Sequence, residues 1–133
     1  DGSGNLDWTA NSGSGSASKP GYNAPSQITN GADYTISTGD WSAGDLEEIY
    51  IIDNTPSSGS SALVVNLPAT NHANVGEGFK LNIKTIGAAG LTLTATSSNK
   101  IDDSGTKGLT TQFESLTLVS NGGAGSSGYW YII

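Results

Sequence analysis

The sequence of 133 residues lacks cysteine, methionine and arginine. Without cysteine it has no disulfide, no thiolate nucleophile and no cysteine-based metal site. Arginine is the side chain best suited to grip phosphate or carboxylate with two hydrogen bonds, so its absence argues against a dedicated anion site. Five lysines against twelve acidic residues give a formal net charge of −7, which repels nucleic acid. Neutral glycans and cations remain compatible ligands.

Long hydrophobic runs are missing too. Apolar stretches last only a few residues, as at 62–65, whereas a bilayer-spanning helix needs roughly 20, so we expect no membrane insertion. Hydrophobic residues make up 35% of the chain, and glycine contributes 19 residues, a composition typical of short strands joined by many turns. A small domain with few apolar residues and no disulfide needs its core, a bound ion or other subunits for stability, so we expect self-association.

The composition divides the chain into two parts. Residues 1–31 are dominated by Gly, Ser, Asn and Ala and form an irregular N-terminal arm. The arm is either a flexible linker or a segment that orders on a neighbouring subunit, with Trp8 and Tyr22 as its anchors. Residues 32–133 form a single domain, within the usual size range for one hydrophobic core.

Residues 32–133 alternate between segments rich in β-branched and aromatic residues and clusters of turn-forming residues. The pattern predicts an all-β fold: an antiparallel, jelly-roll-like β-sandwich of about seven to eight short strands. The expected strands are residues 33–37, 48–53, 62–67, 78–86, 91–96, 115–120 and 129–133. We expect hairpin connections at 87–90 and at 121–128, the second of them long and flexible.

Two kinds of strand can be distinguished by periodicity. Residues 80–84, 91–94 and 116–118 alternate apolar with polar side chains, so we expect these strands to share one sheet with a buried and a wet face. Residues 49–52, 63–65 and 129–133 are apolar on both faces and need cover on both. Either a subunit interface or the loops of the same chain supplies that cover.

The most informative motif is a set of short sequence segments, or phrases, that follow one another in a fixed order. An apolar strand ends in Leu67-Pro68, and the chain closes on the aromatic run at 129–133. Between them lie ANVGEGFKLNIK at 73–84, LTL at 91–93, Ile101-Asp102 and ESLTLVSNG at 114–122. Residues 48–133 thereby resemble a small β-domain found at the C-termini of bacteriophage tail fibres and related virion appendage proteins. The longer Gly/Ser loop between Ser120 and Tyr129 departs from that pattern.

The resemblance implies a non-catalytic structural protein on the virion surface, in a tail or head fibre or as a capsid decoration. It implies a homotrimer that assembles with other virion proteins and contacts a host receptor, and it carries no catalytic residue. The alternative is a carbohydrate-binding module or cell-surface adhesin domain that uses exposed aromatic residues on neutral host glycans.

Acidic and histidine residues give no pattern for catalysis. Glu47 and Glu48 are sequence neighbours, as are Asp102 and Asp103, and neighbours in a strand point to opposite faces, so neither pair suits two-carboxylate catalysis. His72 is the only histidine, without a second ligand or a nucleophile motif. The calcium-like spacing of acidic and polar residues at 1–7 lacks the bidentate glutamate at its twelfth position. We therefore expect no enzyme activity, no cofactor and no metal.

Aromatic side chains are the best candidates for partner contact. Trp8, Trp41, Tyr129 and Tyr131 are the residues we expect to stack on sugars or anchor an interface. Trp41 lies between glycine-flanked turns, which predicts a loop-borne contact. In a strand either Trp130 or its two tyrosine neighbours must face inward, so part of this cluster belongs to the core.

Overall fold

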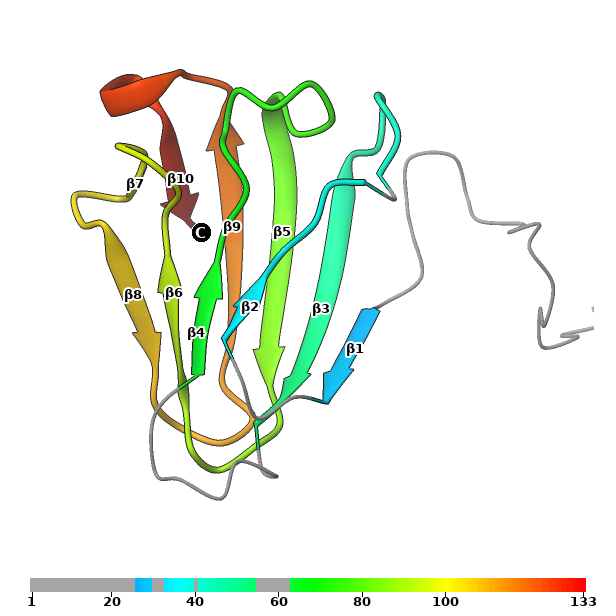
Figure 1. Cartoon of the computed structure of the whole chain (residues 1–133), viewed down its shortest axis with the longest axis vertical. Coiled ribbons are helices and arrows are strands. Elements are labelled where there is room, and N and C mark those ends of the chain that lie inside the picture. Colours follow the sequence, from blue (N-terminus) through cyan, green and yellow to red (C-terminus); the bar gives the residue numbers. More distant parts are fainter. Residues whose placement is uncertain (1–25, 30–32, 40, 55–62) are drawn as a thin grey trace, which may run out of the picture.

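The strands of this chain form two packed layers (Figure 1). The computed structural model describes residues 26–29, 33–39, 41–54 and 63–133. The strands are β1 (Ser26–Thr29), β2 (Tyr34–Thr35), β3 (Glu47–Asp53), β4 (Leu63–Asn66), β5 (Glu77–Thr85), β6 (Leu91–Thr94), β7 (Lys100–Ile101), β8 (Thr106–Leu109), β9 (Ser115–Asn121) and β10 (Tyr129–Ile132), with a 3₁₀ turn, η1 (Gly125–Ser127). None of the described residues belongs to a helix long enough to cross a membrane.

The chain changes layer at every connection from β1 to β6. One sheet has the order β1-β3-β5-β9-β10-β7 and the other β2-β4-β6-β8. Successive strands within a layer are parallel here, as in β1-β3-β5 and β2-β4-β6, because each return to a layer passes through the opposite one. β8 and β9 are antiparallel to their neighbours β6 and β5, and β10 pairs antiparallel with β9 but parallel with β7.

The all-β sandwich is confirmed, but the antiparallel arrangement is wrong. A jelly roll consists of antiparallel Greek keys, whereas both sheets here are mixed. Side chains alternate with period two in either kind of sheet, so alternation carries no information on strand direction. The glycine turn at 87–90 is correspondingly no hairpin, because it leads from β5 in one layer to β6 in the other.

All seven expected strands are present, together with three short ones, β1, β7 and β8. β1 falls inside the expected N-terminal arm and pairs with β3, so the described sheet begins at Ser26 rather than near residue 32. The remainder of that arm, with Trp8 and Tyr22, lies outside the described residues. The three alternating strands do not share one sheet as expected, since β5 and β9 lie in one layer and β6 in the other.

Apolar side chains from both layers fill the space between the sheets. β3 shows the rule, because its side chains alternate between partly exposed and buried along the whole strand. The fully buried members include Ile52, Val65, Leu81, Leu93, Leu109, Leu118 and Trp130. Trp130 is the largest of them, and its indole Nε1 donates a hydrogen bond to the Pro68 carbonyl at 3.2 Å. The apolar surface of this side chain is therefore buried, and its one polar atom has a hydrogen-bond partner.

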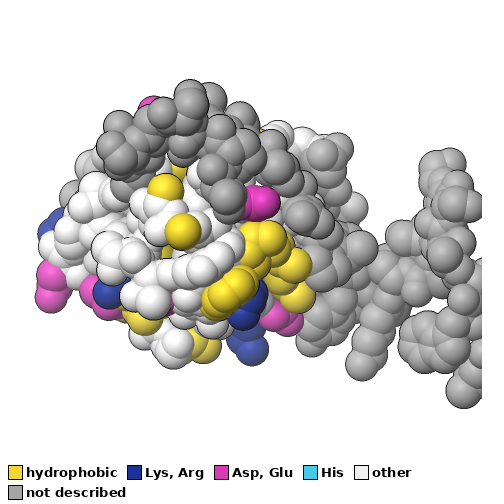
Figure 2. Space-filling model, turned by 90° about the horizontal axis from the view of Figure 1, so that it is seen from below, with side chains coloured by type: hydrophobic (Ala, Val, Ile, Leu, Met, Phe, Trp, Pro, Cys, Tyr) yellow, Lys and Arg dark blue, Asp and Glu magenta, His cyan; other side chains and the backbone are white. Residues whose placement is uncertain are grey.

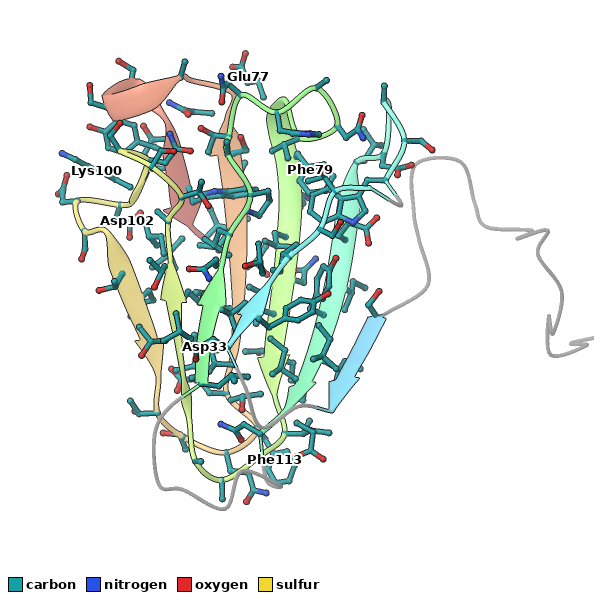
Figure 3. All side chains as sticks on the ribbon, viewed as in Figure 1. Asp33, Glu77, Phe79, Lys100, Asp102 and Phe113 are labelled. Carbon is teal, nitrogen blue, oxygen red and sulfur yellow. The ribbon has the colours of Figure 1, made fainter. Side chains whose placement is uncertain are left out.

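Trp41 belongs to this core, so its expected role as an exposed contact residue is wrong. Its side chain is 6% exposed and stacks on Phe79 with ring centroids 5.0 Å apart, while Tyr50 lies 6.4 Å away. Figure 3 shows Phe79 near the end of the sandwich opposite Phe113. The glycines around Trp41 let the connection between β2 and β3 fold its indole inward.

The strands that are apolar on both faces have partial cover from their own chain. Ile49 and Ile51 on β3 and Val64 on β4 point outward and are partly buried. The strongly exposed large apolar side chains lie elsewhere: Leu46, Phe113, Tyr131 and Ile133. Figure 2 shows the end of the sandwich that carries the β5–β6 and β8–β9 connections, where hydrophobic side chains gather beside lysines.

Replacing Trp41 with alanine should lower the free energy of unfolding by about 3–5 kcal/mol, because it empties a large buried volume. Phe113→Ala is the matched control, since Phe113 is 60% exposed and its removal should change stability by less than about 1 kcal/mol. Urea unfolding of both variants measures the difference. Equal stability of the two would contradict the packing of Trp41 in the core.

Candidate functional site

The aromatic strand at the end of the chain divides its rings between core and surface. Because Trp130 points inward, Tyr129 and Tyr131 both emerge on the outer face of the six-stranded sheet. Their rings stack with centroids 5.6 Å apart and planes 6° from parallel. Tyr131 is 46% exposed and Tyr129 is half-buried. The two tyrosines thus form one rigid aromatic surface.

β7 brings charged side chains to this surface. Parallel pairing places Lys100 opposite Tyr129, and the Lys100 ammonium lies 5.8 Å from the centre of the Tyr129 ring. The chain then turns at Asp102 and Asp103, with reciprocal backbone hydrogen bonds between Ile101 and Ser104. Figure 3 shows Lys100 and Asp102 close together at this edge of the sandwich.

Asp102 connects the turn to the aromatic strand. Its backbone has a φ of 49°, a left-handed conformation that aspartate tolerates better than most residues. Its amide donates to the Trp130 carbonyl at 2.9 Å, and its carboxylate Oδ1 accepts the amide of Ile132 at 3.1 Å. The carboxylate therefore fixes the relative position of the turn and β10.

Asp102, Asp103, Tyr129 and Tyr131 together line an open pocket of about 590 Å³. Because the pocket is open, a ligand bound there would keep part of its surface in water. The pocket contains carboxylate oxygens that accept hydrogen bonds, phenol hydroxyls that both donate and accept, and aromatic ring faces. We name these four residues the Tyr–Asp pocket.

Buried polar side chains hold the loop that precedes the aromatic strand. Asn121 Oδ1 accepts the amides of Gly123 and Tyr129 at 3.0 and 2.8 Å, while its Nδ2 donates to the Ser127 carbonyl at 2.9 Å. Asn99, itself 4% exposed, donates from Nδ2 to the Gly125 carbonyl at 2.8 Å. A loop of glycine and serine, expected to be flexible, is therefore tied at several points to the sheet.

Thr70 links Asn99, the loop and β9 through hydrogen bonds. Its amide donates to Asn99 Oδ1 at 3.1 Å, and its hydroxyl donates to the Gly123 carbonyl at 2.6 Å. The Ser120 hydroxyl in turn donates to the Thr70 carbonyl at 3.3 Å. The side chains of Thr70, Asn99 and Ser120 are buried, so each of their hydrogen bonds that is lost leaves a costly unpaired atom.

The structure separates the remaining acidic candidates. Glu47 and Glu48 point to opposite faces of β3, as expected, with Glu48 only 2% exposed and Glu47 accepting a hydrogen bond from Asn82 Nδ2. Asp102 and Asp103 lie in a turn instead of a strand and line the same pocket, so the expected opposite orientation does not apply to them.

His72 is a surface residue with a structural role. Its Nδ1 accepts the amide of Asn74 at 3.2 Å, which places the ring proton on Nε2, where it meets the Thr38 hydroxyl at 3.1 Å. Within the described ranges no three His, Asp or Glu side chains gather in a way that could hold a metal ion. The calcium-like segment at residues 1–7 lies outside those ranges.

The sequence pointed to Tyr129 and Tyr131 as candidates for contact, but not to the charged side chains that the structure places beside them. Lys100, Asp102 and Asp103 reach them through a two-residue strand that pairs with residues about thirty positions later. Periodicity cannot reveal so short a strand. The one signal of this strand in the sequence was Ile101-Asp102, which is one of the ordered phrases that carry the resemblance.

Gly128→Ala should lower the free energy of unfolding by more than about 2 kcal/mol. A Cβ at residue 128 would overlap Asn99 Nδ2 and Thr70 Oγ1 and lie 2.7 Å from the Gly123 carbonyl oxygen. Gly105→Ala is the control, because a Cβ there meets nothing within 4 Å. Chemical denaturation compares the two, and a Gly128 variant as stable as the control would show that the loop is not held by this network.

Comparison of the sequence with models of known protein families gave no match, and comparison with curated proteins gave none either. The resemblance to virion appendage domains therefore rests on the ordered phrases between Leu67 and Ile133.

Proposed function

We propose that the chain is a non-catalytic domain on the surface of a virion that acts by binding, and that the Tyr–Asp pocket is its contact with a host-cell glycan. The single observation that carries the binding role is the stacked tyrosine pair beside two carboxylates, with the Tyr131 ring exposed. Tyr131 is 46% exposed even though it is a large aromatic residue, and it lines a pocket instead of standing alone.

The chemistry of the pocket suits a sugar ring. The C–H face of a pyranose packs against an aromatic side chain, and its hydroxyls donate to carboxylate oxygens and exchange hydrogen bonds with phenols. The pocket is held by Asp102 at one side and by the Asn121 network at the other. A site fixed in this way loses little conformational entropy when a ligand binds.

The virion part of the proposal is supported by the ordered phrases, which run from the end of β4 through β10. Assembly into a homotrimer that joins other virion proteins is supported by the exposed apolar side chains Leu46 and Ile133, which are not among the residues that line the pocket. Large apolar side chains with this much exposure are suited to burial against a second subunit.

A carbohydrate-binding module or adhesin domain is the second candidate, and the same pocket favours it. The two candidates share the ligand and differ in assembly. The virion domain works as a trimer on a particle, whereas a binding module works as a single unit attached to a larger protein.

The purified chain should sediment as a complex of three copies of the 13.5 kDa polypeptide at micromolar concentration. Sedimentation velocity over a dilution series measures this. A stable monomer throughout the series would contradict the trimer and favour the single binding module. Glycan binding does not depend on this result.

Tyr131→Ala should weaken glycan binding at least about tenfold, because it removes the exposed ring of the stack. Phe113→Ala removes an aromatic side chain that is 60% exposed outside the pocket and should leave binding unchanged. A glycan array followed by titration of each hit gives the affinities. Equal losses in both variants, or no bound glycan at all, would contradict the assignment of the pocket.

A further inference from the structure

The Tyr–Asp pocket carries more negative charge than a neutral sugar requires. Asp102 and Asp103 are both exposed, and the charges of these two carboxylates and of the Lys100 ammonium beside Tyr129 sum to −1, from −2 and +1. Asp102 commits Oδ1 to the amide of Ile132. Among the described residues, Asp103 has no hydrogen-bond or ion-pair partner, so its carboxylate is available to a ligand.

The aromatic part of the pocket also attracts positive charge. The face of a tyrosine ring is electron-rich, and the chain already places the Lys100 ammonium 5.8 Å from the centre of Tyr129. Tyr129 thus has Lys100 and Tyr131 as neighbours, and Tyr131 keeps the larger exposed area. A second ammonium group would meet the same attraction at Tyr131.

We propose that the Tyr–Asp pocket selects saccharides that carry a free amino group over their N-acetylated and carboxylated counterparts. The inference rests on the proposed glycan-binding function and names its ligand class. A protonated amine gains from both carboxylates and from the ring faces, whereas an N-acetyl group gains only from packing and hydrogen bonds.

An acidic sugar is the least favoured ligand. Lys100 does not line the pocket, and the chain has no arginine with which to hold a carboxylate. The two pocket aspartates and the net charge of −7 both oppose the approach of an anion. The expected order of affinity is therefore amino, then N-acetyl, then acidic sugar.

Isothermal titration with three oligosaccharides of equal length tests this order: a glucosamine oligomer, an N-acetylglucosamine oligomer and an oligogalacturonate. At about pH 6, where the sugar amine is protonated, the glucosamine oligomer should bind about three- to tenfold more tightly than the N-acetylated one. The preference should shrink in about 0.5 M salt, because exposed charges are screened.

Asp103→Asn should reduce that preference about two- to fivefold and leave affinity for the N-acetylated oligomer within about twofold. Asp102→Asn should reduce the preference to a similar extent without disturbing the fold. Asparagine keeps the acceptor for the Ile132 amide and tolerates the left-handed backbone. Asp33→Asn is the matched control: it removes one charge at the start of the other sheet and keeps the acceptor for the Val64 amide.

The outcomes separate the two proposals. If the N-acetylated oligomer binds as tightly as the glucosamine oligomer, charge selection is wrong while glycan binding stands. If Asp33→Asn lowers the preference as much as Asp103→Asn, the preference comes from the net charge and the pocket does not select. If none of the three oligosaccharides binds, both the charge selection and the proposed glycan-binding function are wrong.

Discussion

The burial of Trp130 is the interaction on which the rest of the molecule depends. Its indole lies fully inside the sandwich and donates to the Pro68 carbonyl, which ties β10 to the segment following β4 in the opposite layer. Because successive side chains of a strand point to opposite faces, the inward position of Trp130 places Tyr129 and Tyr131 on the outer face. The core of the domain and its proposed contact surface are thus two sides of one strand.

Sequence patterns predicted which segments become strands but not how they pair. Alternation in residues 80–84 located the buried side chains of β5, because burial depends only on which face a residue occupies. Strand direction and layer depend on contacts distant in sequence, which explains the wrong hairpin at 87–90 and the missed β7. The prediction for Trp41 was wrong for another reason: its glycine-rich neighbours suggest a surface loop, yet the indole packs on Phe79 in the core.

The Gly/Ser loop before β10 shows how composition alone misleads. Small residues there allow close backbone approach, and Asn99, Asn121 and Thr70 use that closeness to bind the loop's carbonyls and amides. The side chains that order the loop lie mostly outside it, so its own composition gave no sign of its rigidity. A loop fixed in this way can set the position of Tyr129 as firmly as a strand does.

The alternation of the chain between layers from β1 to β6 has a consequence for how such a domain could change in evolution. Each passage through both layers adds one strand to each sheet, so the winding resembles a short solenoid closed by the antiparallel strands β8 to β10. Insertion or loss of one complete winding alters the width of the sandwich at the β1 side. The β10–β7 end of the sheet, where the tyrosines and aspartates meet, keeps the same neighbouring strands. The width of the sandwich can therefore change in evolution without altering the residues of the Tyr–Asp pocket.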